Sequence, residues 1–236
     1  MYLLWRDPRE DRAQFHQKLR TEVAQKLVAL GGRGVTLNVS DAEVDPAIAR
    51  VTQMKSRPLH EAVAQLWVDT ANTEFRTPFD EALQAACYRI AGYLVTESEA
   101  IHNTRHPPRA GERTVGWSQM AFFPKPRRLT REAWLEIWRN SHTRVAIDTQ
   151  DTYLYRQNLV LQSLTAGAPQ YDAIVEEGFE KASMTDLNAF YDAVGDNAKR
   201  DRNEKAMMES CARFIDFDQI DVIAISQYVV KPIGPD

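Results

Sequence analysis

The segment KPRRLTREAWLEIWRNSHTRVAIDTQDTYLYRQN, residues 125–158, decides the fold of this chain. It is typical of a loop, an amphipathic helix and an aromatic strand in succession. Within the helix one set of side chains recurs at i, i+3, i+4, i+7, i+8 and i+11, namely Trp134, Ile137, Trp138, Ser141, His142 and Val145. Because these positions share one face of a helix, the pattern predicts that His142 lies in the interior beside two tryptophans. Such a histidine is either a packed core residue or the chemical centre of a pocket.

The bulk composition is that of a globular protein able to form a full core. The chain has 236 residues, of which 44% are hydrophobic and 26% are charged. Its formal net charge of −4 gives no electrostatic reason to bind nucleic acid. No apolar run approaches the roughly 20 residues of a membrane span, and the apolar N-terminal stretch is too short for a signal peptide. We therefore expect a cytoplasmic protein that binds neither nucleic acid nor membrane.

The sequence lacks the common motifs of cofactor and metal chemistry. It contains no CxxC, GxGxxG, P-loop, HExxH or GxSxG sequence. His102 and His106 have the i, i+4 spacing of a helical metal pair, but prolines follow directly and no third ligand is evident. Cys87 and Cys211 are far apart in sequence, which favours two free thiols over a disulfide. We expect neither a cofactor nor a metal.

The predicted elements occur in the same order twice. In the first half the pattern predicts strands at residues 1–5, 35–39, 62–68 and 90–95, and helices at 9–30 and 78–87. In the second half it predicts strands at 115–123, 153–161, 171–179 and 219–230, and helices at 130–149 and 185–214. Each half is therefore interpreted as a βαββαβ repeat, with residues 1–105 the first and 106–236 the second. Alignment of the halves places Val23 opposite His142.

A βαββαβ unit forms a four-stranded antiparallel sheet with both helices on one face. Two such sheets packed face to face close a barrel-like core between them. We therefore predict an α+β protein in which two ferredoxin-like repeats form a barrel within one chain. The alternative is two independent ferredoxin-like domains.

Three stretches, KPRRLTREAWLEIWRNSH, YLYRQN and YDAIVEEGF, resemble the EthD family of the dimeric α+β barrel superfamily. The matching positions are Trp134, Trp138 and His142 in the helix, Tyr155 and Asn158 in the strand, and Tyr171, Asp172 and Phe179 in the third stretch. The resemblance covers Val115 to Tyr228 and makes the first half a degenerate copy. It implies the barrel fold. Related barrels include cofactor-free monooxygenases, polyketide cyclases, isomerases and haem enzymes, so the fold does not select a reaction.

His142 is the first candidate for catalysis. An imidazole has an ordinary pKa near 6.5, so modest burial can poise it as a general acid or base. The alternative is a core histidine packed on Trp138 near the end of its helix. In the following strand Tyr153 and Tyr155 share one face and Asn158 lies on the other. Tyr155 is the preferred partner of His142; if the tyrosines instead face the helices, Asn158 is the amide that faces the pocket.

Other side chains are candidates for substrate binding. Asp172 and Glu176 share a strand face, so two carboxylates can reach one cavity, unless that face is exposed. Trp117 and Trp138 are candidates for an aromatic pocket around a planar substrate, or else are core residues.

The leading hypothesis is a small cofactor-free enzyme acting on an apolar or aromatic carbonyl compound inside the barrel. Its proton chemistry would run through His142 and Tyr155, with Trp117, Trp138, Asn158 and Asp172 binding the substrate. One alternative is a non-catalytic binding or accessory protein that holds a hydrophobic ligand. A haem protein of the same superfamily is a third reading. A small hydrophobic molecule is the expected partner, and a homodimer is compatible with the sequence.

Overall fold

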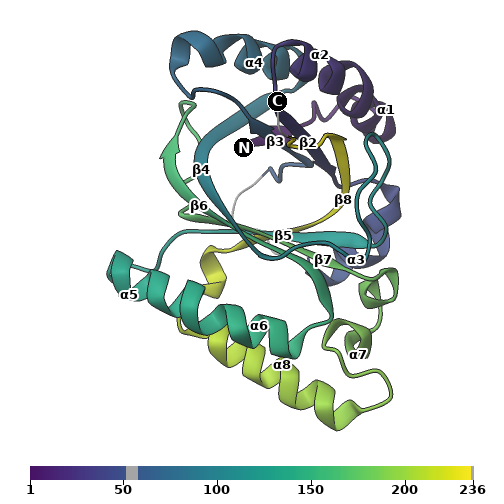
Figure 1. Ribbon diagram of the computed structural model, residues 1–236, viewed down its shortest axis with the longest axis vertical. Helices are drawn as coiled ribbons and strands as arrows, with labels where there is room; N and C mark the ends of the chain where they lie inside the picture. Colours follow the sequence, from purple (N-terminus) through teal and green to yellow (C-terminus); the bar gives the residue numbers. More distant parts are fainter. Residues whose placement is uncertain (52–57, 235–236) are drawn as a thin grey trace.

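The computed structural model describes residues 1–51 and 58–234 and shows a closed antiparallel barrel flanked by helices (Figure 1). Within these residues the barrel has eight strands in the order β1-β3-β2-β8-β5-β7-β6-β4. Their bounds are Tyr2–Trp5 (β1), Gly34–Val39 (β2), Ala62–Trp67 (β3), Arg89–Ile101 (β4), Trp117–Phe123 (β5), Thr152–Ser163 (β6), Ala173–Phe179 (β7) and Asp221–Lys231 (β8). The predicted α+β class and the barrel are thus confirmed.

The helices form two layers on opposite sides of the barrel. Figure 1 shows α1, α2 and α4 on one side and α5, α6 and α8 on the other. The α-helices are Arg12–Lys18 (α1), Ala24–Ala29 (α2), Asp45–Val51 (α3), Thr73–Ala86 (α4), Arg131–Leu135 (α5), Thr143–Thr149 (α6), Leu187–Phe190 (α7) and Asn197–Ala212 (α8). π-Helical turns join α1 to α2 (η1, Leu19–Val23) and α5 to α6 (η3, Glu136–His142), and short 3-10 turns are Ala42–Val44 (η2), Lys181–Met184 (η4) and Phe217–Gln219 (η5). In the described part of the chain, no helix combines the length and apolar character needed to cross a membrane.

The two halves of the chain are joined edge to edge through strand pairing. The first half contributes the run β4-β1-β3-β2 and the second the run β8-β5-β7-β6. At one seam β2 pairs with β8 from Val35 to Val39, and at the other β4 pairs with β6 from Tyr93 to Ile101. Both pairings are antiparallel. Closure therefore gives each outer strand of one half a hydrogen-bonding partner in the other half, and the barrel has no open edge.

Three apolar clusters result from the alternation of side chains along the strands. One contains only residues from strands and loops of both halves, including Leu3, Met120, Phe122, Ile174 and Ile223, and fills the barrel. The second packs the first-half sheet on α1, α2 and α4. The third packs the second-half sheet on α5, η3, α6 and α8, and also includes residues of η2 and α3 from the first half. Since neighbouring residues of a strand point to opposite faces, each barrel strand supplies both an inner and an outer core.

The helix that carries His142 forms where the sequence predicted it. Thr130 caps its N-terminus, with Oγ1 accepting a hydrogen bond of 3.2 Å from the backbone N–H of Ala133. The helix then runs without interruption to Thr149, but its middle portion η3 is π-helical and ends at His142. In the first half η1 is also π-helical and ends at Val23, the residue that the alignment of the halves places opposite His142.

Some boundaries differ from the predictions. A strand was predicted only over residues 90–95, but β4 continues to Ile101 because β6 pairs with it along that length. A helix was expected to begin at Pro78, but α4 begins at Thr73 and Pro78 lies inside it. No helix was predicted between the strands at 35–39 and 62–68, but α3 lies there. The helix predicted over residues 185–214 is divided in two, because α7 ends at Phe190 and α8 begins at Asn197.

Gly116 precedes β5 in a conformation that only glycine adopts easily, with φ at +85°. A Cβ at this position would lie 2.2 Å from the backbone oxygen of Phe179. Gly111 has a similar φ of +78°, and a Cβ there would have no heavy atom within 4 Å. We expect Gly111→Ala to cost about 1–2 kcal/mol from the left-handed backbone alone. Gly116→Ala should cost roughly 1–3 kcal/mol more, because the backbone must also move.

Urea unfolding of the two variants checks this prediction. Gly111→Ala serves as the matched control, since it shares the backbone strain without the contact. Equal losses in the free energy of unfolding would show that the approach of Gly116 to β7 is not tight.

Candidate functional site

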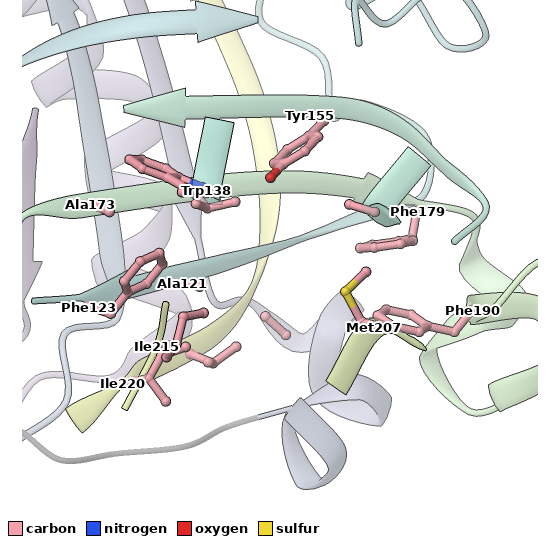
Figure 2. Packing of buried hydrophobic residues seen from close by; sticks show 14 of the residues in the cluster. Ala121, Phe123, Trp138, Tyr155, Ala173, Phe179, Phe190, Met207, Ile215 and Ile220 are labelled. Atoms are coloured by element: carbon pink, nitrogen blue, oxygen red, sulfur yellow. The ribbon is translucent and has the colours of Figure 1, made fainter. Parts of the chain in front are cut away.

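The cavity that contains His142 lies between the outer face of the second-half sheet and the helices that cover it. Its volume is about 400 Å³, within the range of small-molecule sites. The strands contribute Gln119, Ala121, Phe123, Tyr155, Val175, Glu177 and Val222, and the helical elements contribute Trp138, His142, Phe190, Met207 and Cys211 among others. Figure 2 shows strand and helix residues of this cluster together, including Phe123, Trp138, Tyr155 and Met207.

The expected position of the pocket was wrong. The sequence reasoning placed it inside the barrel, between the two sheets. The cavity lined by His142 is instead on the helix side, because Ala121 and Phe123 of β5 and Val175 and Glu177 of β7 point away from the barrel interior. The period of two along a strand shows which residues share a face, but not which face meets the helices.

Aromatic rings form much of the cavity wall. The ring of Phe123 lies edge-on to Trp138 and to Phe214, each at a centroid distance of 5.9 Å. Trp134 packs beside Trp138 at 5.0 Å and is fully buried. Such edge-on arrangements are favoured between aromatic rings and make a rigid wall. The wall therefore suits a flat, largely apolar molecule.

His142 is held inside this wall and is neutral at pH 7. Its Nδ1 lies 2.9 Å from Oγ of Ser210 in α8, and its ring centroid is 4.6 Å from that of Phe214. The residue is 5% exposed. Burial, helped by the nearby positive charge of Arg213, lowers the pKa of His142 to about 4. The helix continues past His142 through α6 to Thr149, so its C-terminus lies about two turns beyond the ring.

Tyr155 reaches the same cavity from β6. Its hydroxyl accepts a hydrogen bond of 3.0 Å from Nε2 of Gln157, which also lies 2.9 Å from Oγ1 of Thr143. Burial raises the pKa of Tyr155 above its ordinary value, so the phenol keeps its proton. Tyr153 does not accompany it: the pairing of β6 with β7 shifts register between Thr152 and Leu154, and the Tyr153 hydroxyl donates to the backbone oxygen of Val115.

Glu177 is a site residue that the sequence reasoning passed over. It is opposite Tyr155 on β6 and opposite Gln119 on β5, and it lines the cavity. Its Oε2 accepts a long hydrogen bond of 3.4 Å from Nε2 of Gln119. Burial raises the pKa of Glu177 to about 7. The sequence contains a signal for this position. Glu177 is two residues from Val175 and two from Phe179, so it shares a strand face with these apolar residues.

The carboxylate pair predicted for this strand does not form. Asp172 precedes β7, and its Oδ2 accepts a hydrogen bond of 2.7 Å from the backbone N–H of Lys125. Glu176 points into the barrel, where it accepts hydrogen bonds from Gln65 and Gln227. Asp172 therefore holds the chain leading into the Trp138 helix and is not among the residues that line the cavity.

Two other predicted binding residues also lie away from this cavity. Trp117 belongs to the same apolar cluster, but its indole N–H donates to Oγ of Ser183 at 2.9 Å and its ring packs on Phe179. Asn158 lies on the barrel side of β6 and lines a separate cavity of about 300 Å³. Of the predicted site residues, the cavity thus brings together Trp138, His142 and Tyr155.

The histidines of the loop after β4 pair with separate carboxylates. Nδ1 of His102 lies 2.8 Å from Glu99, and Nε2 of His106 lies 2.7 Å from Glu180. Among residues 1–51 and 58–234, no group of three or more His, Cys, Asp or Glu side chains is placed to hold a metal ion.

Comparison with known proteins gives a match to a family model and a similarity to solved structures. Residues 126–218 match the EthD domain model, so the match falls entirely within the second half of the chain. The fold is similar to that of a solved structure described as "Crystal structure study of anthrone oxidase-like protein", with a TM-score of 0.53 and 10% sequence identity. That similarity covers 99% of this chain and 93% of the other. At this identity it shows a shared fold alone. No curated protein gives a significant match.

The neutral state of His142 predicts a loss of stability in acid. Its pKa is about 4 when folded, against 6.5 for an ordinary histidine, so the folded state binds fewer protons than the unfolded state between these values. The free energy of unfolding should therefore fall as the pH drops from 6.5 toward 4. In His142→Gln, which keeps a polar group beside Ser210 but does not titrate, we expect the loss between pH 7.5 and 4.5 to be smaller by roughly 2–3 kcal/mol.

Urea unfolding at the two pH values measures this difference. His102→Gln is the matched control, because that side chain is 71% exposed and should leave the pH dependence as in the wild type. An unchanged pH dependence in His142→Gln would mean that His142 is not kept neutral by burial.

Proposed function

We propose that the cavity between the second-half sheet and its helices binds a planar aromatic carbonyl compound and removes a proton from a carbon atom whose acidity the carbonyl group raises, directly or through the aromatic rings. The observation that carries this proposal is that a buried carboxyl, Glu177, and the neutral imidazole of His142 line the same aromatic cavity of about 400 Å³. Groups whose surroundings shift their pKa values in this way recur at acid–base sites.

Glu177 is the proposed base. Its pKa of about 7 lies near the pH at which the protein would work, which is where a general base is most effective. Its one hydrogen-bond donor, Gln119, is at the long distance of 3.4 Å, and neither Lys nor Arg lines this cavity among the described residues. The carboxylate thus keeps an oxygen for a substrate proton.

His142 and Tyr155 are the proposed hydrogen-bond donors to the substrate oxygen. When the Ser210 hydroxyl donates to Nδ1 of His142, the proton of the neutral ring lies on Nε2. A neutral donor aligned with the carbonyl oxygen stabilises the enolate that forms as the proton leaves. The phenol of Tyr155 is the second group, held by Gln157. Trp138 and Phe123 would stack on the flat part of the substrate.

The name of the structural neighbour supports anthrone, a flat tricyclic ketone with an acidic methylene group, as the first compound to try. Removal of a methylene proton by Glu177 gives the enolate. The enolate then reacts with molecular oxygen, and loss of water gives anthraquinone. This chemistry needs no cofactor.

The proposed activity is checked by the absorbance of anthraquinone formed from anthrone in air. We expect kcat to rise with pH about a midpoint near 7, because the carboxylate form of Glu177 is the base. Glu177→Gln should lower kcat by at least about 100-fold and remove this pH dependence. His142→Ala should lower kcat by roughly 100-fold, as loss of one donor to the developing negative charge does elsewhere.

Binding is measured separately through the tryptophan fluorescence of Trp138, which an aromatic ligand in the cavity should quench. The matched control is Glu209→Gln, an exposed carboxylate on α8, which should leave both binding and kcat unchanged. If the ligand quenches the fluorescence of the wild type but is not converted, the proposed enzymatic activity is wrong. The protein would then be a binding protein for hydrophobic ligands. Full activity in folded Glu177→Gln and His142→Ala would reject the assigned residues.

We also infer that the two halves are ferredoxin-like repeats, of which only the second keeps the site. The same strand order in both halves and the confinement of the EthD match to residues 126–218 support this. Val23 stands at the end of η1 where His142 ends η3, so the first half lacks the imidazole.

A further inference from the structure

A second cavity, of about 300 Å³, lies on the opposite face of β6 from the candidate active site. It is at one end of the barrel, beside the end of β3 and the middle of β4. Its polar residues include Gln65, Glu97 and Asn158, and its apolar residues include Leu94 and Val95. Gln65 donates to Glu176 of β7, a strand that is not a neighbour of β3 in the barrel, so these side chains meet inside it.

Buried amide groups face this cavity without a hydrogen-bond partner. Asn158 is 1% exposed, and neither its Oδ1 nor its Nδ2 has a partner within the described residues. Gln65 is 2% exposed, and its Oε1 is also without a partner there. A buried polar atom left in this state destabilises the fold, so three such atoms around one cavity point to a ligand that pairs with them.

The groups that face the cavity and remain unpaired are mainly hydrogen-bond acceptors, because the amide donors of the neighbouring glutamines bind Glu176. Glu176 is fully buried and accepts hydrogen bonds of 2.9 Å from Gln65 and 2.6 Å from Gln227. The amide N–H groups of both glutamines are therefore directed at Glu176. What remains for a ligand is Oε1 of Gln65, both Oδ1 and Nδ2 of Asn158, and the carboxylate of Glu97 at the exposed mouth.

The charge around the cavity is negative. Arg156 lies 2.9 Å from Glu99 and 3.6 Å from Glu176, so one guanidinium serves two carboxylates.

Glu97 adds a carboxylate for which no ion pair is found among the described residues, whereas Asp69, which also lines the cavity, pairs with Arg33. The N-terminal amine of Met1, another lining residue, donates to the backbone oxygen of Tyr93, and burial lowers its pKa to about 5, so it adds no positive charge at pH 7. A cationic ligand would balance this charge, whereas an anionic one would be repelled.

We propose that this end of the barrel binds a small organic cation, a primary ammonium group on a short alkyl chain. The ammonium group donates to Oδ1 of Asn158 and Oε1 of Gln65, and the carboxylate of Glu97 offsets its charge. The alkyl chain lies against Leu94 and Val95. This site is independent of the proposed enzyme, because alternate faces of β6 line the two cavities.

Calorimetric titration with n-butylammonium tests the proposal, with 1-butanol as a neutral ligand of equal size and butyrate as an anionic one. We expect butylammonium to bind at least tenfold more tightly than 1-butanol, and butyrate not to bind. Glu97→Gln should weaken butylammonium binding about tenfold. The matched control is Glu112→Gln, an exposed carboxylate in the loop before β5, which should bind as the wild type does.

The variant Asn158→Leu tests whether the Asn158 amide binds a ligand or only stabilises the fold. Leucine has nearly the shape of asparagine, so the variant should fold with unchanged or higher stability, since it removes two unpaired buried atoms. Its affinity for butylammonium should nevertheless fall by at least tenfold. The proposal is overturned if butylammonium and 1-butanol bind equally, if both variants bind as the wild type does, or if crystals grown with butylammonium hold only water in this cavity.

Discussion

The alternation of side chains along strands that are covered on both faces is the constraint on which this structure depends. In a closed barrel with helices outside, an odd residue and its even neighbour belong to different cores. Glu176 and Glu177 show the result. Glu176 lies inside the barrel with two amide donors and a guanidinium at 3.6 Å. Glu177 lies outside among aromatic rings with one weak donor, and there it holds a pKa of about 7. Adjacent residues of the same type thus have different chemistry.

The closure of the barrel fixes these assignments. A slip of one residue between β6 and β7 would exchange the two faces and place Tyr155 inside the barrel. The register between these strands is continuous from Leu154 to Leu159, and its irregularity is confined to the bulge at Tyr153. Gly178, opposite Leu154, leaves room for the Tyr153 ring, which would lie 2.6 Å from a Cβ at that position. The bulge therefore ends where the site begins, and the residues that line the cavity keep strict alternation.

Much of the fold followed from local patterns, but the position of the site did not. Helical spacing located the helix of Trp134, Trp138 and His142 to within a residue, because that signal lies in a short segment. The length of β4 depended on its pairing with β6, which is a contact between distant segments. The choice between Tyr155 and Asn158 was left open by sequence, since period two gives relative faces only. In the structure Tyr155 lines the cavity on the helix side of the sheet, and Asn158 lines the separate cavity on the barrel side.

The two cavities also share an energetic property. Glu177 and Asn158 are both buried with few or no partners, and each such group costs about 1–3 kcal/mol. Burial of a large aromatic side chain contributes a similar or larger amount, and Trp117, Trp134 and Trp138 are all almost completely buried in one cluster. The cluster can therefore hold Glu177 in its unfavourable position, and the barrel core does the same for Asn158. Since these costs are met by packing elsewhere, a ligand that pairs with either group recovers free energy that the protein alone cannot.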